Sequence, residues 1–206
     1  MGQKGVLAVI SGFSGAGKGT VVKRLLEQHE YSLSISATTR SPREGEEHGR
    51  EYFFLTREEF ESMIEQDGLI EWAEYVGNYY GTPKSYVQTC LAEGKDVILE
   101  IELQGAMKVK QQFPEAVLLF LTPPSVQELK SRLVGRGTET MEVVEKRLHR
   151  AKEECHYMDQ YDHLVINDDL QTCVDQVHEV IQSAKTQTGR NSELIEDIQR
   201  QLADYQ

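Results

Sequence analysis

The stretch GVLAVISGFSGAGKGT, residues 5–20, decides the fold of this chain. It opens with a short apolar run, typical of a buried parallel strand, and continues into a glycine-rich loop. Gly12, Gly17 and Lys18 fit the phosphate-loop pattern G-x-x-x-x-G-K-[ST], except that Gly19 stands at the last position and the hydroxyl follows at Thr20. Residues 18–30 carry apolar side chains at helical spacing. Strand, loop and helix therefore follow in the order that the motif requires.

This loop predicts a site for a nucleoside triphosphate. Its backbone N–H groups and the helix N-terminus would surround phosphate oxygens, and Lys18 would reach the β- and γ-phosphates. The residues expected to contact the triphosphate are Gly12, Phe13, Ser14, Gly15, Ala16, Gly17, Lys18, Gly19 and Thr20. The pattern does not separate GTPases, motors, transporters and kinases, so the second substrate must be inferred from other residues.

The remainder of the chain alternates between strand and helix patterns. Buried strands are predicted within 96–105, 116–124 and 163–168, and helices within 83–94, 125–137, 139–158 and 170–184. This α/β pattern indicates a parallel-sheet core with helices on both faces. Residues 34–95 interrupt it with strand patterns at 32–40, 52–55 and 69–82 and a helix opened by a Thr56–Glu59 capping box. We interpret that region as a mixed α+β insertion.

The expected organisation is a single domain over residues 1–206. Its parts are a core of residues 1–33, 96–126 and 156–190, an insertion of residues 34–95, a small helical lid of residues 127–155, and a C-terminal helix of residues 191–206.

Composition narrows the functional classes. The formal net charge of -12 argues against a general nucleic-acid or membrane binder, and no apolar run reaches the ~20 residues of a membrane span. Three widely spaced cysteines without a C-x-x-C motif predict neither a disulfide framework nor a zinc site. These features favour a cytoplasmic protein. They leave self-association open.

A second anion site is predicted from the segment SATTRSPREGEEHGREYFF, residues 36–54. Arg40 and Arg43 lie three positions apart just after a predicted strand, and Tyr52 follows. Two guanidinium groups and a phenol can form a tight clamp around an anion such as a phosphate. In a chain of negative net charge, such a local concentration of arginines is informative.

Several motifs together resemble the guanylate kinase family. They include TTRSPREGE, LIEWAEY followed by GNYYGT, LEIELQG, RGTET and VINDDL, and the resemblance runs from about residue 6 to 184 in order. It implies a nucleoside monophosphate kinase fold with a GMP-binding insertion and a lid. The implied reaction is Mg²⁺-dependent transfer from ATP to GMP, and to dGMP, in purine nucleotide metabolism and GMP recycling.

The resemblance also implies roles for individual residues. Arg40, Arg43, Tyr52 and Tyr80 would hold the GMP phosphate, and Ser36, Glu71 and Thr82 would contact guanine. Glu100 and Glu102, expected on one strand face, would act at the GMP side or in water-mediated Mg²⁺ binding; the family usually has Asp at the second position. The implied catalytic residues are Lys18, Arg40, Arg43, Arg136 and Arg147. Arg132 and Arg136 would also contact ATP, and Asn167 would lie beside its adenine or cap the next helix.

Guanine chemistry independently supports the assignment of Glu71. Guanine presents adjacent N1–H and amino donors, which match the two oxygens of a carboxylate. Adenine has no N1–H and would leave the carboxylate unsatisfied. Tyr79 and Tyr80 alternate along a strand, so only one of them can face the site. The resemblance implies that this residue is Tyr80 and that Tyr79 packs inside the protein.

Three alternatives remain distinct from a GMP kinase. They are a peptide-binding module that has lost catalysis, a kinase for AMP or a pyrimidine monophosphate, and a regulatory NTPase. The presence of Lys18, the paired arginines and Glu71 argues against them. Because Gly19 lacks a hydroxyl, we expect Mg²⁺ to be held mainly by nucleotide oxygens and water, with Thr20 as the one candidate side-chain ligand. No side-chain general base is expected.

Overall fold

The computed structural model describes residues 4–75, 77–135, 140–203 and 205. Its main sheet contains five parallel strands in the order β2-β7-β1-β8-β9. Their bounds are Ser32–Leu33 (β2), Val97–Glu100 (β7), Leu7–Gly12 (β1), Val117–Thr122 (β8) and His163–Ile166 (β9). Because all five strands are parallel, their carboxyl ends meet at one edge of the sheet, where ligands bind in open α/β folds.

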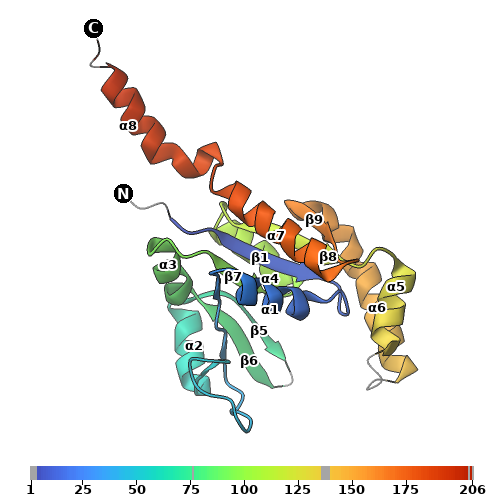
Figure 1. Ribbon diagram of the computed structural model, residues 1–206. Helices are drawn as coiled ribbons and strands as arrows, with labels where there is room; N and C mark the ends of the chain where they lie inside the picture. The colour runs from blue at the N-terminus through green and yellow to red at the C-terminus, as the bar shows by residue number, and fades with distance from the viewer. Residues whose placement is uncertain (1–3, 76, 136–139, 204, 206) are drawn as a thin grey trace.

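Helices cover both faces of this sheet (Figure 1). Helices α1 (Lys18–Gln28) and α7 (Leu170–Ala184) pack side by side on one face, and α4 (Leu103–Gln112) lies on the other. Helix α3 (Lys84–Ala92) also packs against β7. Helices α5 (Val126–Gly135) and α6 (Met141–Glu154), followed by the 3-10 helix η1 (Cys155–Gln160), lie past the carboxyl end of β8. The predicted parallel-sheet core with helices on both faces is confirmed.

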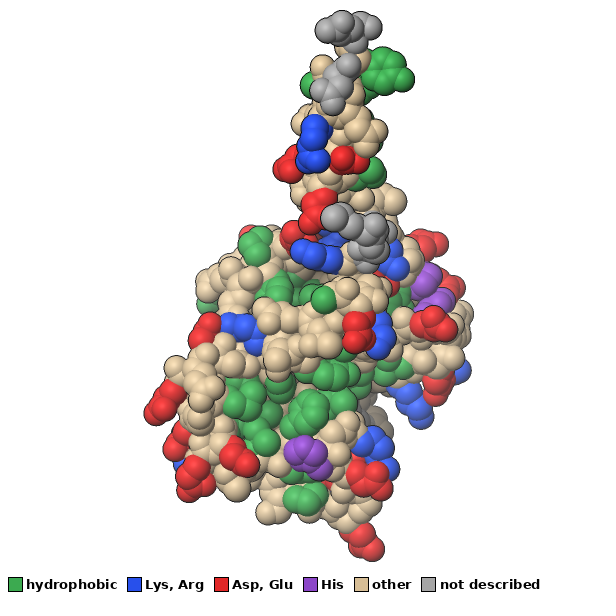
Figure 2. Space-filling model, turned by 90° about the vertical axis from the view of Figure 1, so that its left-hand side faces the viewer, with side chains coloured by type: hydrophobic (Ala, Val, Ile, Leu, Met, Phe, Trp, Pro, Cys, Tyr) green, Lys and Arg blue, Asp and Glu red, His purple; other side chains and the backbone are tan. Residues whose placement is uncertain are grey.

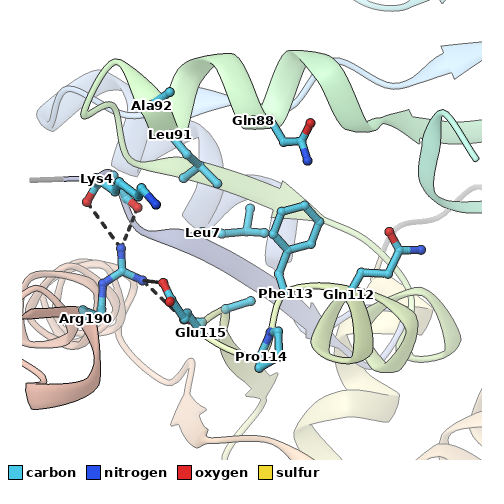
Figure 3. Close-up of a pocket in the computed structure, with 12 residues that line it drawn as sticks. Lys4, Leu7, Gln88, Leu91, Ala92, Gln112, Phe113, Pro114, Glu115 and Arg190 are labelled. Atoms are coloured by element: carbon cyan, nitrogen blue, oxygen red, sulfur yellow. Dashed lines mark hydrogen bonds and ion pairs between the residues drawn. The ribbon is translucent and has the colours of Figure 1, made fainter. Parts of the chain in front are cut away.

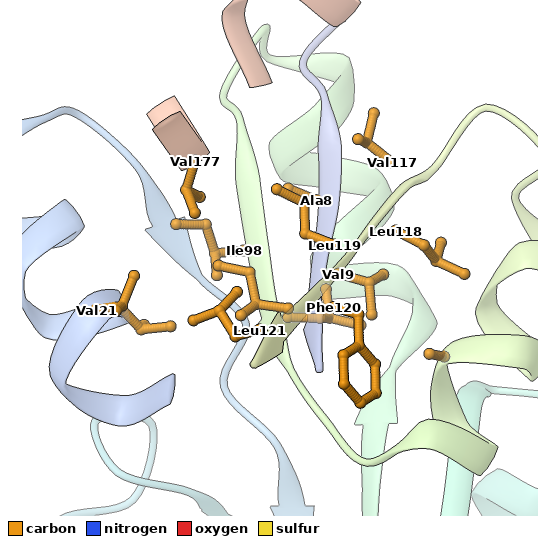
Figure 4. Close-up of a cluster of buried hydrophobic side chains, with 14 of the residues drawn as sticks. Ala8, Val9, Val21, Ile98, Val117, Leu118, Leu119, Phe120, Leu121 and Val177 are labelled. Atoms are coloured by element: carbon orange, nitrogen blue, oxygen red, sulfur yellow. The ribbon is translucent and has the colours of Figure 1, made fainter. Parts of the chain in front are cut away.

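The central strands are apolar except near their carboxyl ends, because both of their faces are covered. Val9, Ile98 and Leu119 on these strands are fully buried, and Val21 of α1 and Val177 of α7 lie on the face of the sheet to which Ile98 points (Figure 4). This close-packed core fixes the positions of the strand ends.

A second, mixed sheet has the strand order β4-β3-β6-β5. The bounds are Phe53–Phe54 (β4), Ala37–Thr38 (β3), Asn78–Pro83 (β6) and Leu69–Tyr75 (β5). Strands β3 and β4 are parallel, whereas β6 is antiparallel to both β3 and β5. Helix α2 (Arg57–Glu65) begins with the predicted capping box, in which Thr56 and Glu59 bond reciprocally, and it buries Phe60 against this sheet.

Two expectations about strands were wrong. Residues 32–40 form two short strands, β2 and β3, which belong to different sheets. The amide of Ser34 still bonds to Ile98 of the main sheet, at 2.9 Å, whereas the carbonyl of Ser36 already accepts from Phe53 of the second sheet. Strand β7 ends at Glu100, and Glu102 is the N-cap residue of α4, so the two glutamates do not share a strand face.

The C-terminal segment leaves the body of the molecule. After the 3-10 helix η2 (Thr188–Asn191), helix α8 (Ser192–Ala203) projects outward (Figures 1 and 2). Its apolar residues Leu194, Ile198 and Leu202 are exposed. Among the described residues, no helix combines the length and apolar character needed to cross a membrane.

Candidate active site

The glycine-rich loop joins the end of β1 to the start of α1 at the carboxyl edge of the main sheet. Gly15 and Gly17 have φ angles of 92° and 90°, in the left-handed region that glycine adopts without strain. The Lys18 ammonium donates to the carbonyls of Gly12, at 2.7 Å, and Phe13, at 3.3 Å. No side chain caps the N-terminus of α1 at Gly17, so backbone N–H groups are available for an anion.

Phe13 and Ala16 are predicted phosphate-loop residues whose side chains point away from any ligand. Phe13 is buried and packs edge-on against Phe120, with ring centroids 5.0 Å apart. Ala16 is fully buried, and its amide donates to the carbonyl of Phe13 at 3.0 Å. Both residues therefore shape the loop through their backbone and anchor it in the core.

Asn167, which follows β9, holds the same loop from the other side. Its buried amide group donates from Nδ2 to the carbonyl of Ala16 at 2.8 Å. A Cβ on Gly17 would stand 2.5 Å from that Nδ2 atom, so glycine is required for this close approach. The alternative role as a helix cap is wrong, because Asp169 is the N-cap residue of α7 and accepts from the amide of Thr172.

Glu100, at the end of β7, faces the beginning of α1. Its two carboxylate oxygens lie 3.7 and 3.8 Å from the point where a Cβ of Gly19 would stand. Burial raises the pKa of Glu100, and the charge of Lys18 opposes that rise. A carboxylate thus lies beside the position where most phosphate loops carry a hydroxyl, while Thr20 is exposed on the first turn of the helix.

The predicted lid contacts the phosphate loop through an arginine of α6. Arg147 donates from a guanidinium nitrogen to Ser14 Oγ at 2.6 Å, so α6 contacts the phosphate loop directly. Arg132 on α5 pairs with Glu128 at 2.7 Å. Burial raises the pKa of Cys173 near the start of α7, and the positive charge of Arg132 opposes that rise. Arg136, the third predicted arginine, lies outside the described residues.

The predicted anion clamp lies beside the second sheet. Arg40 makes two hydrogen bonds to Glu46, at 2.9 and 3.0 Å, and the amide of Arg43 donates to the same carboxylate at 2.7 Å. The Arg40 guanidinium also lies over the ring of Tyr52, 5.5 Å from its centroid. Hydrogen bonding to Arg40 holds the pKa of Glu46 below its ordinary value. Arg40 through its guanidinium and Arg43 through its backbone amide therefore meet at one carboxylate of the same loop.

Tyr80 is adjacent to this clamp, whereas Tyr79 is not. The ring centroids of Tyr52 and Tyr80 are 6.1 Å apart, and the Tyr80 hydroxyl is a neighbour of Arg40. Tyr79 instead stacks on Phe60 at 5.2 Å, as expected for the strand position that faces the small core of the second sheet.

Glu71 and Thr82 form a polar pair on neighbouring strands. Thr82 is fully buried and donates from Oγ1 to Glu71 Oε1 at 2.8 Å. Burial raises the pKa of Glu71, while the Thr82 hydrogen bond and the charge of Lys108 oppose the rise. Ser36 lies in the segment between β2 and β3 and is half-buried. A half-satisfied carboxylate is thus held in a largely desolvated position.

Glu102 points toward α6 of the predicted lid instead of toward the anion clamp. Its carboxylate is in contact with the guanidinium of Arg150 on α6, which also pairs with Glu154 at 2.8 Å. Both Glu102 and Arg150 are exposed. The longer side chain at a position where the family usually has Asp therefore links the start of α4 to α6.

Sequence reasoning missed Glu46 as the partner of the clamp. A detectable signal exists, because Glu46 follows Arg43 by three residues within a loop that carries both charges. The approach of Glu71 to Gly105 and the electrostatic effect of Lys108 on it, both from α4, were also missed. Local sequence spacing could not predict these interactions, because Glu71 lies in the second sheet whereas α4 packs against the main sheet.

A separate cavity of about 400 Å³ lies at the opposite edge of the main sheet (Figure 3). Leu7, Leu91 and Phe113 line it, and Arg190 closes one side by donating to the carbonyls of Gly5, at 2.6 Å, and Lys4, at 3.3 Å. The cavity marks where the C-terminal segment packs against the start of β1, and none of the predicted site residues lines it.

Comparisons with known proteins relate the chain to one family of sequences and structures. The sequence model of a family described as guanylate kinase matches residues 4–184. The chain is 55% identical over 181 residues to the guanylate kinase of Halalkalibacterium halodurans, covering 87% of this chain and 88% of the relative. It is 54% identical over 183 residues to that of Bacillus subtilis, covering 88% and 90%. A crystal structure of guanylate kinase from Anaplasma phagocytophilum matches with a TM-score of 0.72 at 32% identity, covering 95% of each chain.

Proposed function

Because the chain belongs to the guanylate kinase family, whose reaction is the phosphorylation of GMP by ATP, we propose that the residues described above form two adjoining nucleotide sites. The observation that carries this proposal is the junction between β7 and α4. Glu100 at the end of β7 faces Gly19 of the phosphate loop, and Gly105, five positions later, faces Glu71 of the second sheet. The ATP and GMP sites would therefore meet at the start of α4.

We propose that Glu71 and Thr82 recognise guanine, with Ser36 beside them. Thr82 donates to Oε1 of the Glu71 carboxylate and not to its second oxygen, Oε2. Two adjacent donors on the guanine edge can satisfy that carboxylate, whereas adenine cannot. The recognition needs ionised Glu71, because a protonated carboxyl would present a donor to guanine donors. dGMP carries the same base and is expected to be accepted as well.

The GMP phosphate would bind to Arg40, Arg43, Tyr52 and Tyr80. In the present structure the Glu46 carboxylate is the anion at these arginines. A phosphate has the same bidentate match to a guanidinium and carries more charge. We therefore infer that Glu46 keeps Arg40 oriented before GMP binds and yields part of that contact to the phosphate.

Phosphoryl transfer would depend on positioning and cationic stabilisation. Lys18 and the loop amides would hold the ATP phosphates, Arg147 and Arg136 would neutralise charge on the transferring group, and Asn167 with Arg132 would border the adenine side. The GMP phosphate is already anionic near neutral pH, so no side chain needs to remove a proton.

Mg²⁺ is expected to accompany ATP. When bound, it would supply positive charge that offsets the negative charge of the phosphates. Glu100 fits an outer-sphere role, since its carboxylate lies beside Gly19 and near Lys18 at the phosphate loop. Thr20 is the one hydroxyl of the first helical turn that follows the lysine. Among the described residues, no group of three or more metal-binding side chains is present.

The acceptor can be tested directly. Purified protein with ATP and Mg²⁺ is expected to release ADP rapidly with GMP or dGMP, and about 10⁴-fold less efficiently with AMP or UMP, because these bases leave Glu71 unsatisfied. A coupled ADP assay measures each kcat/KM. Equal ADP release with and without GMP would show that the chain is an ATPase and not a GMP kinase.

Replacing Arg147 tests the contribution of α6. Arg147→Ala is expected to lower kcat by about 10²-fold, since one positioned cationic donor at the transferring group is lost. The KM for GMP should change little, because Arg147 contacts the phosphate loop through Ser14. Lys146→Ala is the control, since Lys146 is exposed and pairs with Glu142 on the same helix. A normal kcat in Arg147→Ala would remove this arginine from the catalytic set.

The protein is expected to act in the cytoplasm. Cys90, Cys155 and Cys173 are free thiols in the structure, as in a reducing compartment. Fractionation of the source cells, followed by detection of the native protein, tests this expectation.

A further inference from the structure

Helix α4, which covers one face of the main sheet, also packs against strand β5 of the second sheet, the strand that carries Glu71. Three residues on one face of α4 contact three consecutive residues of β5. Gly105 faces Glu71, Lys108 donates to the carbonyl of Trp72 at 3.3 Å, and Gln112 donates to the carbonyl of Ile70 at 3.1 Å. The spacing of three and then four positions places these residues in a row along the helix.

Gly105 is the point of closest approach to the Glu71 side chain. A Cβ at this position would lie 3.3 Å from Glu71 Oε2, 3.4 Å from Glu71 Cγ and 3.3 Å from a methyl carbon of Ile101. These distances are shorter than ordinary van der Waals contact. The carboxylate would have to move by a few tenths of an ångström to accept one methyl group. The position of Glu71 therefore depends on the absence of a side chain at residue 105.

Lys108 adds a positive charge to the same environment. The charged or polar groups that act on the Glu71 carboxylate are Thr82 from β6, Lys108 from α4 and Glu102 at the N-cap of α4. Lys108 and Thr82 favour the ionised carboxylate, whereas burial and Glu102 oppose it. The Lys108 ammonium is held near Trp72, the residue after Glu71, by its bond to the backbone of β5.

We propose that Gly105 and Lys108 are positioning residues for GMP selectivity: Gly105 leaves the space in which Glu71 takes its guanine-binding position, and Lys108, held on the backbone of the same strand, places a positive charge near that carboxylate. This inference rests on the proposed guanine-binding role of Glu71. It makes α4 a part of the acceptor site, although neither residue need touch GMP.

Gly105→Ala tests the steric half of the proposal. The KM for GMP is expected to rise about tenfold, because displacement of a binding group by a fraction of an ångström weakens its contacts. The KM for ATP should stay unchanged. Alanine is favoured over glycine inside a helix by about 1 kcal/mol, so the variant should not lose helix stability. A thermal unfolding measurement checks this. Wild-type KM for GMP in a folded Gly105→Ala protein would overturn this half.

Lys108→Met tests the electrostatic half. The KM for GMP is expected to rise about fivefold near neutral pH, the upper range for an exposed charge pair. The pH below which GMP binding weakens should also move upward, because Glu71 would protonate more readily. Lys108→Arg keeps the charge and should restore both quantities. Gln112→Met is the matched control, since it removes a neighbouring helix–strand hydrogen bond without changing charge. An equal effect of Lys108→Met and Gln112→Met, with no change in the pH profile, would assign Lys108 to packing alone and overturn its role.

The Glu71→Gln variant separates this inference from the function on which it rests. If Glu71→Gln loses GMP efficiency while Gly105→Ala and Lys108→Met behave like wild type, the guanine role stands and the positioning role fails. If Glu71→Gln itself binds GMP normally, the guanine role fails first. In a Glu71→Gln background, Lys108→Met should add no further loss, because Lys108 acts through the missing carboxylate. An additive loss would show that Lys108 acts by another route.

Discussion

Lys18→Ala is expected to reduce kcat/KM for ATP by about 10³-fold, the scale of removing a preorganised donor from charge that develops in a transition state. Lys18 is the first residue of α1, and its ammonium donates to the carbonyls of Gly12 and Phe13. Binding of ATP would replace these carbonyl contacts by phosphate oxygens. Removal of the ammonium leaves the loop amides in place, so weak nucleotide binding should persist while turnover is lost.

Steady-state kinetics with saturating GMP, together with calorimetric titration of ATP, measure the two parts of this expectation. Lys23→Ala is the matched control, because Lys23 is an exposed lysine of the same helix. Both variants should unfold at temperatures close to that of the wild type. Wild-type turnover in Lys18→Ala would contradict the proposed role of the phosphate loop in this chain.

Sequence patterns correctly predicted the elements that are determined by residues close together in the chain. The apolar run, the loop and the amphipathic helix of residues 5–30 correspond to β1 and α1, and the predicted segment 170–184 is α7 from end to end. The Thr56–Glu59 capping box is present in full. In each case the residues that determine the element lie within one or two turns of each other, so their spacing carries the information.

Long-range pairing explains the expectations that were wrong. The alternating pattern of residues 32–40 predicts one strand, although the expected boundary between core and insertion fell within it; the division into two strands depends on Ile98 and Phe53 as hydrogen-bond partners. The end of β7 at Glu100 likewise depends on where α4 can start. Individual site residues could be chosen through the family resemblance, but their partners could not. The contact of Arg150 with Glu102 and that of Gly105 with Glu71 arise only when the elements are assembled.

Glu71→Gln is expected to lower kcat/KM for GMP by about 10³-fold, less than the roughly 10⁴-fold by which sites built on hydrogen bonds reject an analogue that lacks the bonded group, because the glutamine carbonyl can still accept from one guanine donor. The amide keeps the size of the carboxylate and offers a carbonyl to one guanine donor. Its NH₂ group then faces the other donor, so a hydrogen bond is exchanged for repulsion between donors. The KM for ATP should not change, because the neighbours of Glu71 in the described part of the chain are Thr82 and α4 and do not include the phosphate loop.

The pH dependence distinguishes a lost recognition group from a damaged fold. Burial raises the pKa of Glu71, so in the wild type the acceptor carboxylate is lost at a higher pH than an ordinary glutamate as acid is added. The KM for GMP should therefore rise at acid pH in the wild type and show a flatter profile in Glu71→Gln. Glu74→Gln, which changes an exposed carboxylate of the same strand, should keep the wild-type profile.

Stability should move in the opposite direction to activity. A carboxyl with a raised pKa in the folded state costs stability when it is ionised; that cost is present above the folded pKa and disappears as the pH falls below the unfolded value of about 4.3. Glu71→Gln removes the cost, so its Tm near neutral pH should equal or exceed that of the wild type, with the difference shrinking on acidification. A lower Tm together with weak GMP binding would instead assign Glu71 a structural role. A higher Tm with lost GMP selectivity would mean that the site holds a destabilising charge because guanine recognition requires it.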